Sequence, residues 1–171
     1  MNDFAAPPAV RRAGPGDARA LVRLRVLMLE AMGTPVGPED APWRAAALDW
    51  FTRRLGDTEE FAAFVVAEPA LGLVSAAVGS LDHHAPGPAN PSGLYGYISN
   101  VSTDPRCRRR GYARACLKAL LGWFEAETPA PVLNLNATAH GRSLYTGLGF
   151  APPHFPALQA HLPLSPPPVA G

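Results

Sequence analysis

The sequence has little cysteine, no long apolar run and almost no excess of charge of either sign. Its 171 residues include 2 cysteines, and 15 Lys and Arg stand against 14 Asp and Glu, which gives a formal net charge of +1. A nucleic-acid-binding domain usually carries a strong basic excess, so this balance argues against a nucleic-acid partner. No apolar run reaches the roughly 18 residues of a membrane-spanning helix, so we expect no membrane partner.

The cysteines and histidines do not form a recognisable metal site. Cys107 and Cys116 lack Cys-x-x-Cys spacing, and His83 and His84 lack a third ligand nearby. We therefore expect no metal, and we favour structural roles for both cysteines over reactive ones. The first residues show no basic start followed by an apolar segment, which predicts no signal peptide and a cytoplasmic protein.

The sequence is rich in residues that break helices and strands, with 20 prolines and 16 glycines. Between these breaks, runs of β-forming residues predict strands, and apolar residues at helical spacing predict helices. The predicted strands cover residues 9–14, 61–68, 72–81, 94–103, 131–139 and 157–162. The predicted helices cover residues 17–32, 42–55, 112–127 and 142–147.

This order of elements predicts an α/β fold with a mixed, mostly antiparallel central sheet flanked by helices. The segment from strand 94–103 through helix 112–127 to strand 131–139 is a βαβ unit. A chain of this length suits a single domain, which we place at residues 1–162. Residues 163–171 are too rich in proline to join a core and are predicted to form a tail.

The most distinctive motif is DPRCRRRGYARA, residues 104–115, where four arginines precede a glycine and a predicted helix. A helix N-terminus carries unpaired N–H groups and partial positive charge, and a glycine lets the backbone approach a ligand closely. A strand, a basic turn and a helix in succession therefore predict a phosphate site. The common nucleotide-loop patterns are absent, and what remains is Arg-x-x-Gly-x-Ala at Arg108, Gly111 and Ala113.

These residues resemble the GCN5-related N-acetyltransferase (GNAT) superfamily. In that family Arg/Gln-x-x-Gly-x-Gly/Ala follows a strand, and its backbone amides bind the pyrophosphate of coenzyme A. SLYTGLGF, residues 143–150, is similar to the closing Tyr-x-x-x-Gly-Phe motif of the family. The resemblance covers nearly the whole chain and is most specific over residues 94–150. It implies a GNAT-like sheet with a splayed βαβ unit, so that residues 1–162 would be one N-acetyltransferase domain.

The resemblance implies acetyl-CoA as co-substrate and assigns its contacts. Strand 94–103 should bulge or splay from residues 133–136 and leave a slot for the pantetheine arm. Thr138 stands where the family often has an asparagine, which reaches further. The implied cofactor-binding residues are Asn100, Val101, Thr103, Arg108, Arg109, Arg110, Gly111, Tyr112, Ala113, Arg114, Thr138 and Tyr145.

The resemblance also implies a mechanism, in which a primary amine of a small molecule or peptide attacks the thioester directly in a ternary complex. The amide at Val101 would hold the thioester oxygen as negative charge develops on it. Tyr145 would protonate the departing thiolate, since a phenol of pKa near 10 is close enough to a thiol of about 8.5. The alternatives are another acyl-CoA or nucleophile, and an acyl-CoA-binding module or regulatory protein without turnover. The family is often dimeric, which makes a homodimer one expected assembly.

The general base and the acceptor pocket are not identified. Where the family often has a glutamate, strand 94–103 offers Tyr95, Tyr97, Ser99 and Asn100. A water chain along the strand is one alternative, and Glu30, His83 and His84 are remote ones. The family builds its acceptor pocket from the segment corresponding to residues 28–43, but Met28, Met32 and Trp43 fit a helix core better.

Overall fold

The computed structural model describes residues 8–163. Contacts divide the chain into two compact units, one ending at Asn136 and the other beginning at Ala137. The second unit contains the short helix α4 (Arg142–Thr146). The first unit contains, in chain order, β1 (Val10–Arg12), the 3-10 turn η1 (Pro15–Asp17), α1 (Ala18–Ala31), α2 (Pro42–Arg54), β2 (Phe61–Glu68), β3 (Gly72–His83), β4 (Leu94–Thr103), the 3-10 turn η2 (Pro105–Cys107), α3 (Tyr112–Glu127) and β5 (Leu133–Leu135).

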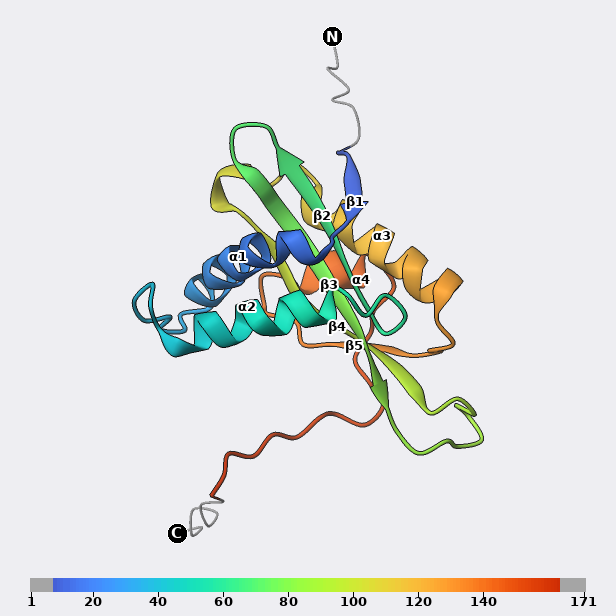
Figure 1. Ribbon diagram of the computed structural model, residues 1–171. Coiled ribbons are helices and arrows are strands. Elements are labelled where there is room, and N and C mark those ends of the chain that lie inside the picture. The colour runs from blue at the N-terminus through green and yellow to red at the C-terminus, as the bar shows by residue number, and fades with distance from the viewer. Residues whose placement is uncertain (1–7, 164–171) are drawn as a thin grey trace. The chain divides into compact units, whose positions relative to one another are not determined.

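The strands form one sheet in the order β1-β2-β3-β4-β5 (Figure 1). β1 to β4 pair antiparallel, whereas β5 pairs parallel to β4. A parallel neighbour requires a crossover connection, and α3 provides it. The predicted mixed, mostly antiparallel sheet with a βαβ unit is therefore confirmed.

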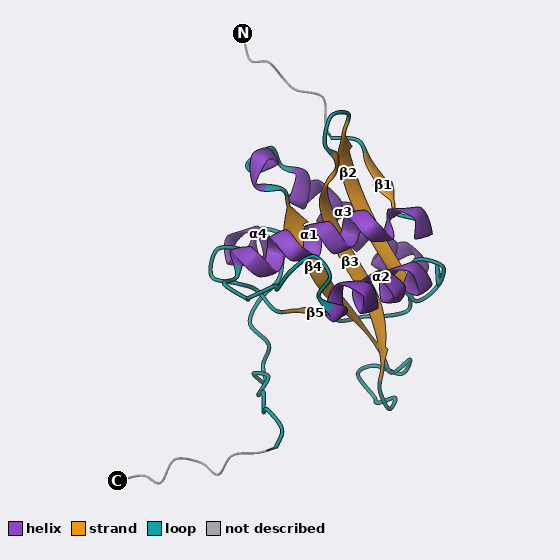
Figure 2. Cartoon of the chain, turned by 60° about the vertical axis from the view of Figure 1, so that its left-hand side comes forward, coloured by secondary structure: helices purple, strands orange, loops and turns teal. Residues whose placement is uncertain are grey.

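Helices cover both faces of the sheet in the first unit. Figures 1 and 2 show α1 and α2 running side by side over the strands. Their buried residues, among them Leu24 and Phe51, belong to one core with Val78 of β3. Gly79, the next residue, faces Leu120 and Phe124 of α3. Because successive residues of a strand point to opposite faces, α3 packs on the face away from α1 and α2.

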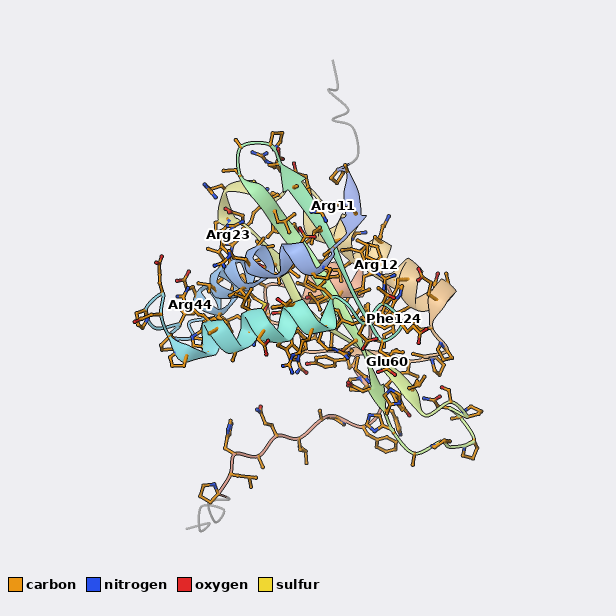
Figure 3. All side chains as sticks on the ribbon, in the orientation of Figure 1. Arg11, Arg12, Arg23, Arg44, Glu60 and Phe124 are labelled. Atoms are coloured by element: carbon orange, nitrogen blue, oxygen red, sulfur yellow. The ribbon has the colours of Figure 1, made fainter. Side chains whose placement is uncertain are left out.

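Two strand glycines make room for α3. A Cβ on Gly79 of β3 would lie 2.8 Å from both Leu120 and Phe124, and one on Gly96 of β4 would lie 2.6 Å from Phe124 and closer still to Leu133. Phe124 is 2% exposed, and its position is labelled in Figure 3. The bare backbone of the two strands therefore allows the helix to approach the centre of the sheet.

Several sequence-based expectations are wrong in detail. β5 is limited to Leu133–Leu135, and residues 157–162 form no strand. Prolines on both sides of that segment lack the N–H that a ladder needs, and its apolar side chains are open to solvent: Leu158 is 97% and Leu162 85% exposed. Of the predicted tail, residues 164–171 lie outside the described residues.

The apolar faces of the helices also differ from the expected ones. Met32, which we placed in the helix core, is 54% exposed, and Trp50 of α2 is 40% exposed. Trp123 of α3, by contrast, is 2% exposed. Helical spacing alone does not show how wide a face the sheet covers, so it could not decide which of these residues are buried.

Both cysteines are buried and unpaired. Burial raises the pKa of the Cys116 thiol to about 11, so this thiol stays protonated at neutral pH. The structural role favoured from the sequence is consistent with this environment. None of the helices within residues 8–163 is long and apolar enough to cross a membrane.

The packing of α3 on the glycines predicts that Gly79→Ala lowers the free energy of unfolding by about 1–3 kcal/mol, because the added methyl group overlaps Leu120 and Phe124. Urea denaturation measures the change. Gly122→Ala in α3 is the matched control: nothing lies within 4 Å of its Cβ position, and alanine should stabilise the helix by about 0.5–1 kcal/mol. A Gly79 variant as stable as wild type would contradict the close packing.

Candidate functional site

The pairing of β4 with β5 ends well before β4 does. The parallel register runs from Gly96↔Leu133 to Ile98↔Leu135 and stops there, whereas β4 continues to Thr103. At the point of separation, Nδ2 of Asn136 donates a hydrogen bond to the Tyr97 hydroxyl at 3.0 Å. Among the strands of the first unit, only β3 pairs with β4 beyond Ile98, an arrangement that the predicted slot requires.

On its other edge β4 carries a bulge. Val78 of β3 is opposite Ser99, but Ala76 is opposite Ser102, so β4 has one residue more than β3 over this stretch. Asn100 has a φ of 47°, in the left-handed region that non-glycine residues seldom occupy. The bulge therefore falls on Asn100 and Val101, two of the residues that the family resemblance implied as cofactor-binding.

Polar contacts tie the bulged segment to its neighbours. Nη1 of Arg25 in α1 donates to Oδ1 of Asn100 at 2.6 Å, and Nδ2 of Asn100 donates to Oγ of Ser99 at 3.2 Å. The Ser102 hydroxyl donates to the Leu24 carbonyl at 2.9 Å. Oγ1 of Thr103, another predicted contact, lies 2.8 Å from the Ser75 hydroxyl in β3. The bulge is therefore fixed from two sides, by α1 and by β3.

Asp104 joins the end of β4 to the arginine loop. Its side chain is buried and accepts hydrogen bonds from the Arg106 backbone at 3.1 Å, from the Arg106 guanidinium at 2.8 Å and from Arg23 of α1 at 3.1 Å. The position of Arg23 beside the loop is labelled in Figure 3. The Arg106 side chain is the main reason that the pKa of Asp104 lies far below its ordinary value. The buried carboxylate thus stays ionised and fixes the start of η2.

The loop itself leaves the N-terminus of α3 open. Arg109 and Gly111 both have left-handed backbones, with φ values of 62° and 78°. No side chain caps α3, and within residues 8–163 the amides of its first turn, at Tyr112, Ala113 and Arg114, have no hydrogen-bond partner. Nothing lies within 4 Å of a Cβ position on Gly111. The predicted phosphate loop therefore combines unpaired amides in the first turn of α3 with free space beside Gly111.

Glu68 at the end of β2 holds the helix start from the side. The Tyr112 hydroxyl donates to its carboxylate, and Arg110 lies 3.5 Å from the same oxygen. The hydrogen bond to Glu68 raises the pKa of Tyr112. The side chains of Arg110 and Tyr112 thus contact Glu68, whereas Arg108 and Arg109, which are exposed, form no ion pair among the described residues.

The second unit carries the remaining predicted residues. The Thr138 hydroxyl accepts a hydrogen bond from the Gly141 amide at 3.1 Å, and its carbonyl accepts one from Arg142 at 3.1 Å, so Thr138 supports the start of α4. Tyr145 lies on α4 with its ring edge toward Phe150, at 6.1 Å between ring centroids. Burial raises the pKa of the Tyr145 phenol.

Three contacts to the predicted site residues were not foreseen from the sequence. Arg25 contacts Asn100, Glu68 contacts Tyr112, and Asp104 holds the start of the loop. Asp104 could have been found, because an aspartate followed by proline is a common start of a helical turn. For Arg25 and Glu68 no local signal exists, since each contacts the site only through the fold.

Other surface features of the first unit lie apart from this site. A hollow of about 460 Å³ is lined by Arg12, Thr58, Glu59, Glu60, Leu81, Glu127 and Pro129, none of which the sequence predicted as a site residue. Arg12 there donates to the carbonyls of Thr58 and Phe61, which is a structural role. Among residues 8–163 no group of three or more His, Cys, Asp and Glu is placed to hold a metal ion.

Comparison with known proteins identifies the family. Residues 25–150 match the acetyltransferase (GNAT) family, and this range holds both the bulge of β4 and the loop before α3. The chain belongs to the GNAT family of acetyltransferases. The resemblance drawn from the loop and closing motifs is thereby confirmed. No curated protein matches the sequence.

Solved structures of GNAT-like proteins share the fold over almost the whole chain. A predicted acetyltransferase from Clostridium acetobutylicum, crystallised with acetyl-CoA, has a TM-score of 0.76 at 23% identity and matches over 90% of this chain and 96% of its own. A GCN5-related N-acetyltransferase from Ralstonia eutropha has a TM-score of 0.71 at 25% identity, over 90% and 98%. Glucosamine-6-phosphate N-acetyltransferase from Arabidopsis thaliana has a TM-score of 0.66 at 13% identity, over 90% and 98%. These likenesses confirm the predicted GNAT-like fold.

The environment of Asp104 predicts that Asp104→Asn lowers the free energy of unfolding at pH 7 by about 1.5–3 kcal/mol, because hydrogen bonds from two arginines lose their charged acceptor. The lowered pKa means that the carboxylate stabilises the fold above the ordinary aspartate pKa of about 4. The advantage of wild type over the variant should therefore shrink as pH falls below about 4.

Urea denaturation at pH 7 and at several lower pH values measures this difference. Asp49→Asn is the control, because Asp49 and its partner Arg53 are both exposed and their pair should contribute little. A difference between wild type and Asp104→Asn that stays constant as the medium becomes acidic would contradict the assigned ionisation.

Proposed function

We propose that this protein is an acetyl-CoA-dependent N-acetyltransferase that transfers an acetyl group to a primary amine in a ternary complex. One observation carries the proposal: the bulged end of β4, released by β5, runs through the arginine loop into an open helix N-terminus. Family membership and the Clostridium neighbour crystallised with acetyl-CoA support the same co-substrate.

The loop fits a pyrophosphate. The first-turn amides of α3 are unpaired donors, and the helix dipole adds partial positive charge at the same place. Gly111 keeps the approach clear of side-chain atoms, while Arg108 and Arg109 are exposed and free of ion pairs among the described residues. We assign the phosphates to the amides of residues 111–114, with charge from these two arginines.

The bulge fits the other end of the co-substrate. Acetyl-CoA supplies an acetyl group activated as a thioester. The free side of β4 beyond Ile98 offers backbone groups to the pantetheine arm, in the manner of an added strand. Val101, within the bulge, would direct its amide at the thioester oxygen and stabilise the negative charge that develops there.

Tyr145 is proposed as the general acid. An ordinary phenol, with a pKa near 10, already keeps its proton at neutral pH, and burial raises the pKa of Tyr145 further, so the proton is present to be donated to the departing thiolate. The role stands on the Tyr-x-x-x-Gly-Phe motif and on this protonation state. Thr138, whose hydroxyl already accepts a hydrogen bond from Gly141, remains a proposed but shorter-reaching contact.

The acceptor is proposed to be a primary amine on a small molecule or peptide. β4 contains no carboxylate, so no strand residue can remove the proton from an ammonium group. Water along β4, near the hydroxyls of Tyr97 and Ser99, is the proposed route for that proton. A chain that binds acetyl-CoA but transfers its acetyl group to no amine would instead be an acyl-CoA-binding module.

Thermal unfolding with and without acetyl-CoA is the first test. A ligand at 100 times its Kd stabilises the native state by about 2.7 kcal/mol. For a chain of this size the unfolding midpoint should therefore rise by roughly 5–10 °C. A DNA duplex at low salt is the comparison ligand and should cause no rise. A rise with DNA but none with acetyl-CoA would favour a nucleic-acid partner instead.

Two variants of nearly equal size test the phosphate loop. Asparagine and aspartate both tolerate the left-handed backbone of Gly111, but only aspartate adds negative charge beside the phosphates. Gly111→Asp should bind acetyl-CoA about tenfold more weakly than Gly111→Asn, because like charges repel. Isothermal titration calorimetry gives both Kd values. Equal affinities in two folded variants would remove the phosphates from this loop.

Tyr145→Phe tests the general acid. With an amine found by screening, kcat should fall by about 100-fold while the Kd for acetyl-CoA stays close to wild type, since only a proton donor is lost. Thr146→Val, which removes an exposed hydroxyl of the same helix that donates to the Ser143 carbonyl at 3.3 Å, is the control and should keep wild-type kcat. An unchanged kcat in Tyr145→Phe would exclude the acid role.

A further inference from the structure

We propose that Arg25 of α1 is a positioning residue that holds the bulge of β4 in the conformation that aims the Val101 amide. The inference rests on the proposed function, because the direction of this amide matters only if a thioester lies against β4. It concerns a residue that lies outside both the arginine loop and the Tyr-x-x-x-Gly-Phe motif and is 75 residues from Asn100 in the sequence.

The bulge needs support because of the residue at its centre. In a bulge whose first residue is left-handed, that residue is usually glycine, which adopts positive φ without steric cost. Here it is Asn100, with a φ of 47°. Asparagine tolerates this conformation better than most residues, but the contacts of its side chain then decide how firmly the backbone is held.

Arg25 supplies the strongest of these contacts. Its Nη1 donates to Oδ1 of Asn100 at 2.6 Å, a hydrogen bond from a charged donor, while the amide group of Asn100 donates to Ser99 at 3.2 Å. Both ends of the Asn100 side chain are therefore engaged. The orientation of the side chain, and with it the left-handed backbone, is fixed between α1 and β4.

The part of α1 that carries Arg25 is itself held in place. The neighbouring Leu24 is 1% exposed in the core, and its carbonyl accepts the Ser102 hydroxyl from the far side of the bulge. Within residues 8–163 no carboxylate lies within ion-pair distance of Arg25, whereas Arg23 on the same helix is paired with Asp104. Among the described residues, the hydrogen bond to Asn100 is therefore the contact that holds the Arg25 guanidinium.

Loss of the Arg25 guanidinium should weaken the binding of the acetyl group more than the binding of the rest of acetyl-CoA. Without it, Oδ1 of Asn100 loses its donor and the extra residue of β4 can relax to another position along the strand. The Val101 amide would then point elsewhere, while the loop at Gly111, on the far side of Asp104, stays unchanged. Acetyl-CoA and CoA differ only in the acetyl group, so the ratio of their affinities reports on this amide.

The test compares the Kd values of acetyl-CoA and CoA by calorimetry in wild type, Arg25→Met and Arg19→Met. Arg19 is an exposed arginine of the same helix and is the matched control. In Arg25→Met the Kd for acetyl-CoA should rise by about three- to tenfold, the loss of one hydrogen bond, while the Kd for CoA stays unchanged. Arg19→Met should change neither Kd. Arg25→Lys keeps a charged donor, so its Kd for acetyl-CoA should lie close to that of wild type.

The same Arg25→Met substitution made in an Asn100→Gly variant separates a positioning role from direct contact with the acetyl group. In Asn100→Gly the left-handed backbone needs no side-chain support, so adding Arg25→Met should have no further effect on either ligand. An effect that persists in this background would mean that Arg25 acts on the acetyl group itself and would overturn the proposal. Equal losses for acetyl-CoA and CoA would also overturn it. A wild-type protein that binds neither ligand would contradict the proposed function as well.

Discussion

The limited pairing between β4 and β5 is the constraint on which the site depends. β4 is held along one edge by β3 as far as Thr103, but β5 follows its other edge only as far as Ile98. Backbone groups released from a ladder must find other partners, and a strand-like ligand can provide them. The crossover helix α3 packs against the start of this pairing, because Phe124 and Leu133 lie close to Gly96. The β4–β5 pairing is therefore packed against α3 at its first residue pair and ends two residues later, at Ile98.

The elements with strong local signals were predictable from the sequence. β2, β4 and α3 have the bounds expected from their apolar patterns and flanking breaks, and the βαβ unit required β5 to lie parallel to β4. Residues 157–162 show a strand-like pattern but form no strand. Pairing is a property of the neighbouring strand as much as of the segment, so local pattern could not decide that case.

The candidate site likewise has one part that the sequence predicts and one part that it does not. The loop from Arg108 to Ala113 could be found because its glycine, charges and helix start are contiguous in the sequence. The bulge at Asn100 could be expected only through the family resemblance, and its support from Arg25 could not be expected at all. That contact spans 75 residues and depends on how α1 crosses the sheet. Tertiary packing decides contacts of this kind, and no residue pattern within α1 or β4 predicts them.

The arginine cluster itself shows how a nearly neutral protein can present a local anion site. Arg106 pairs with the buried Asp104, which also pairs with Arg23, and Arg110 lies beside Glu68, so the two carboxylates offset part of the positive charge around the loop. Among the described residues Arg108 and Arg109 have no such partner, and they flank the open N-terminus of α3. A few arginines beside one helix N-terminus suit a small phosphorylated ligand such as the proposed co-substrate, whereas a polyanion requires many phosphate contacts over a wide face.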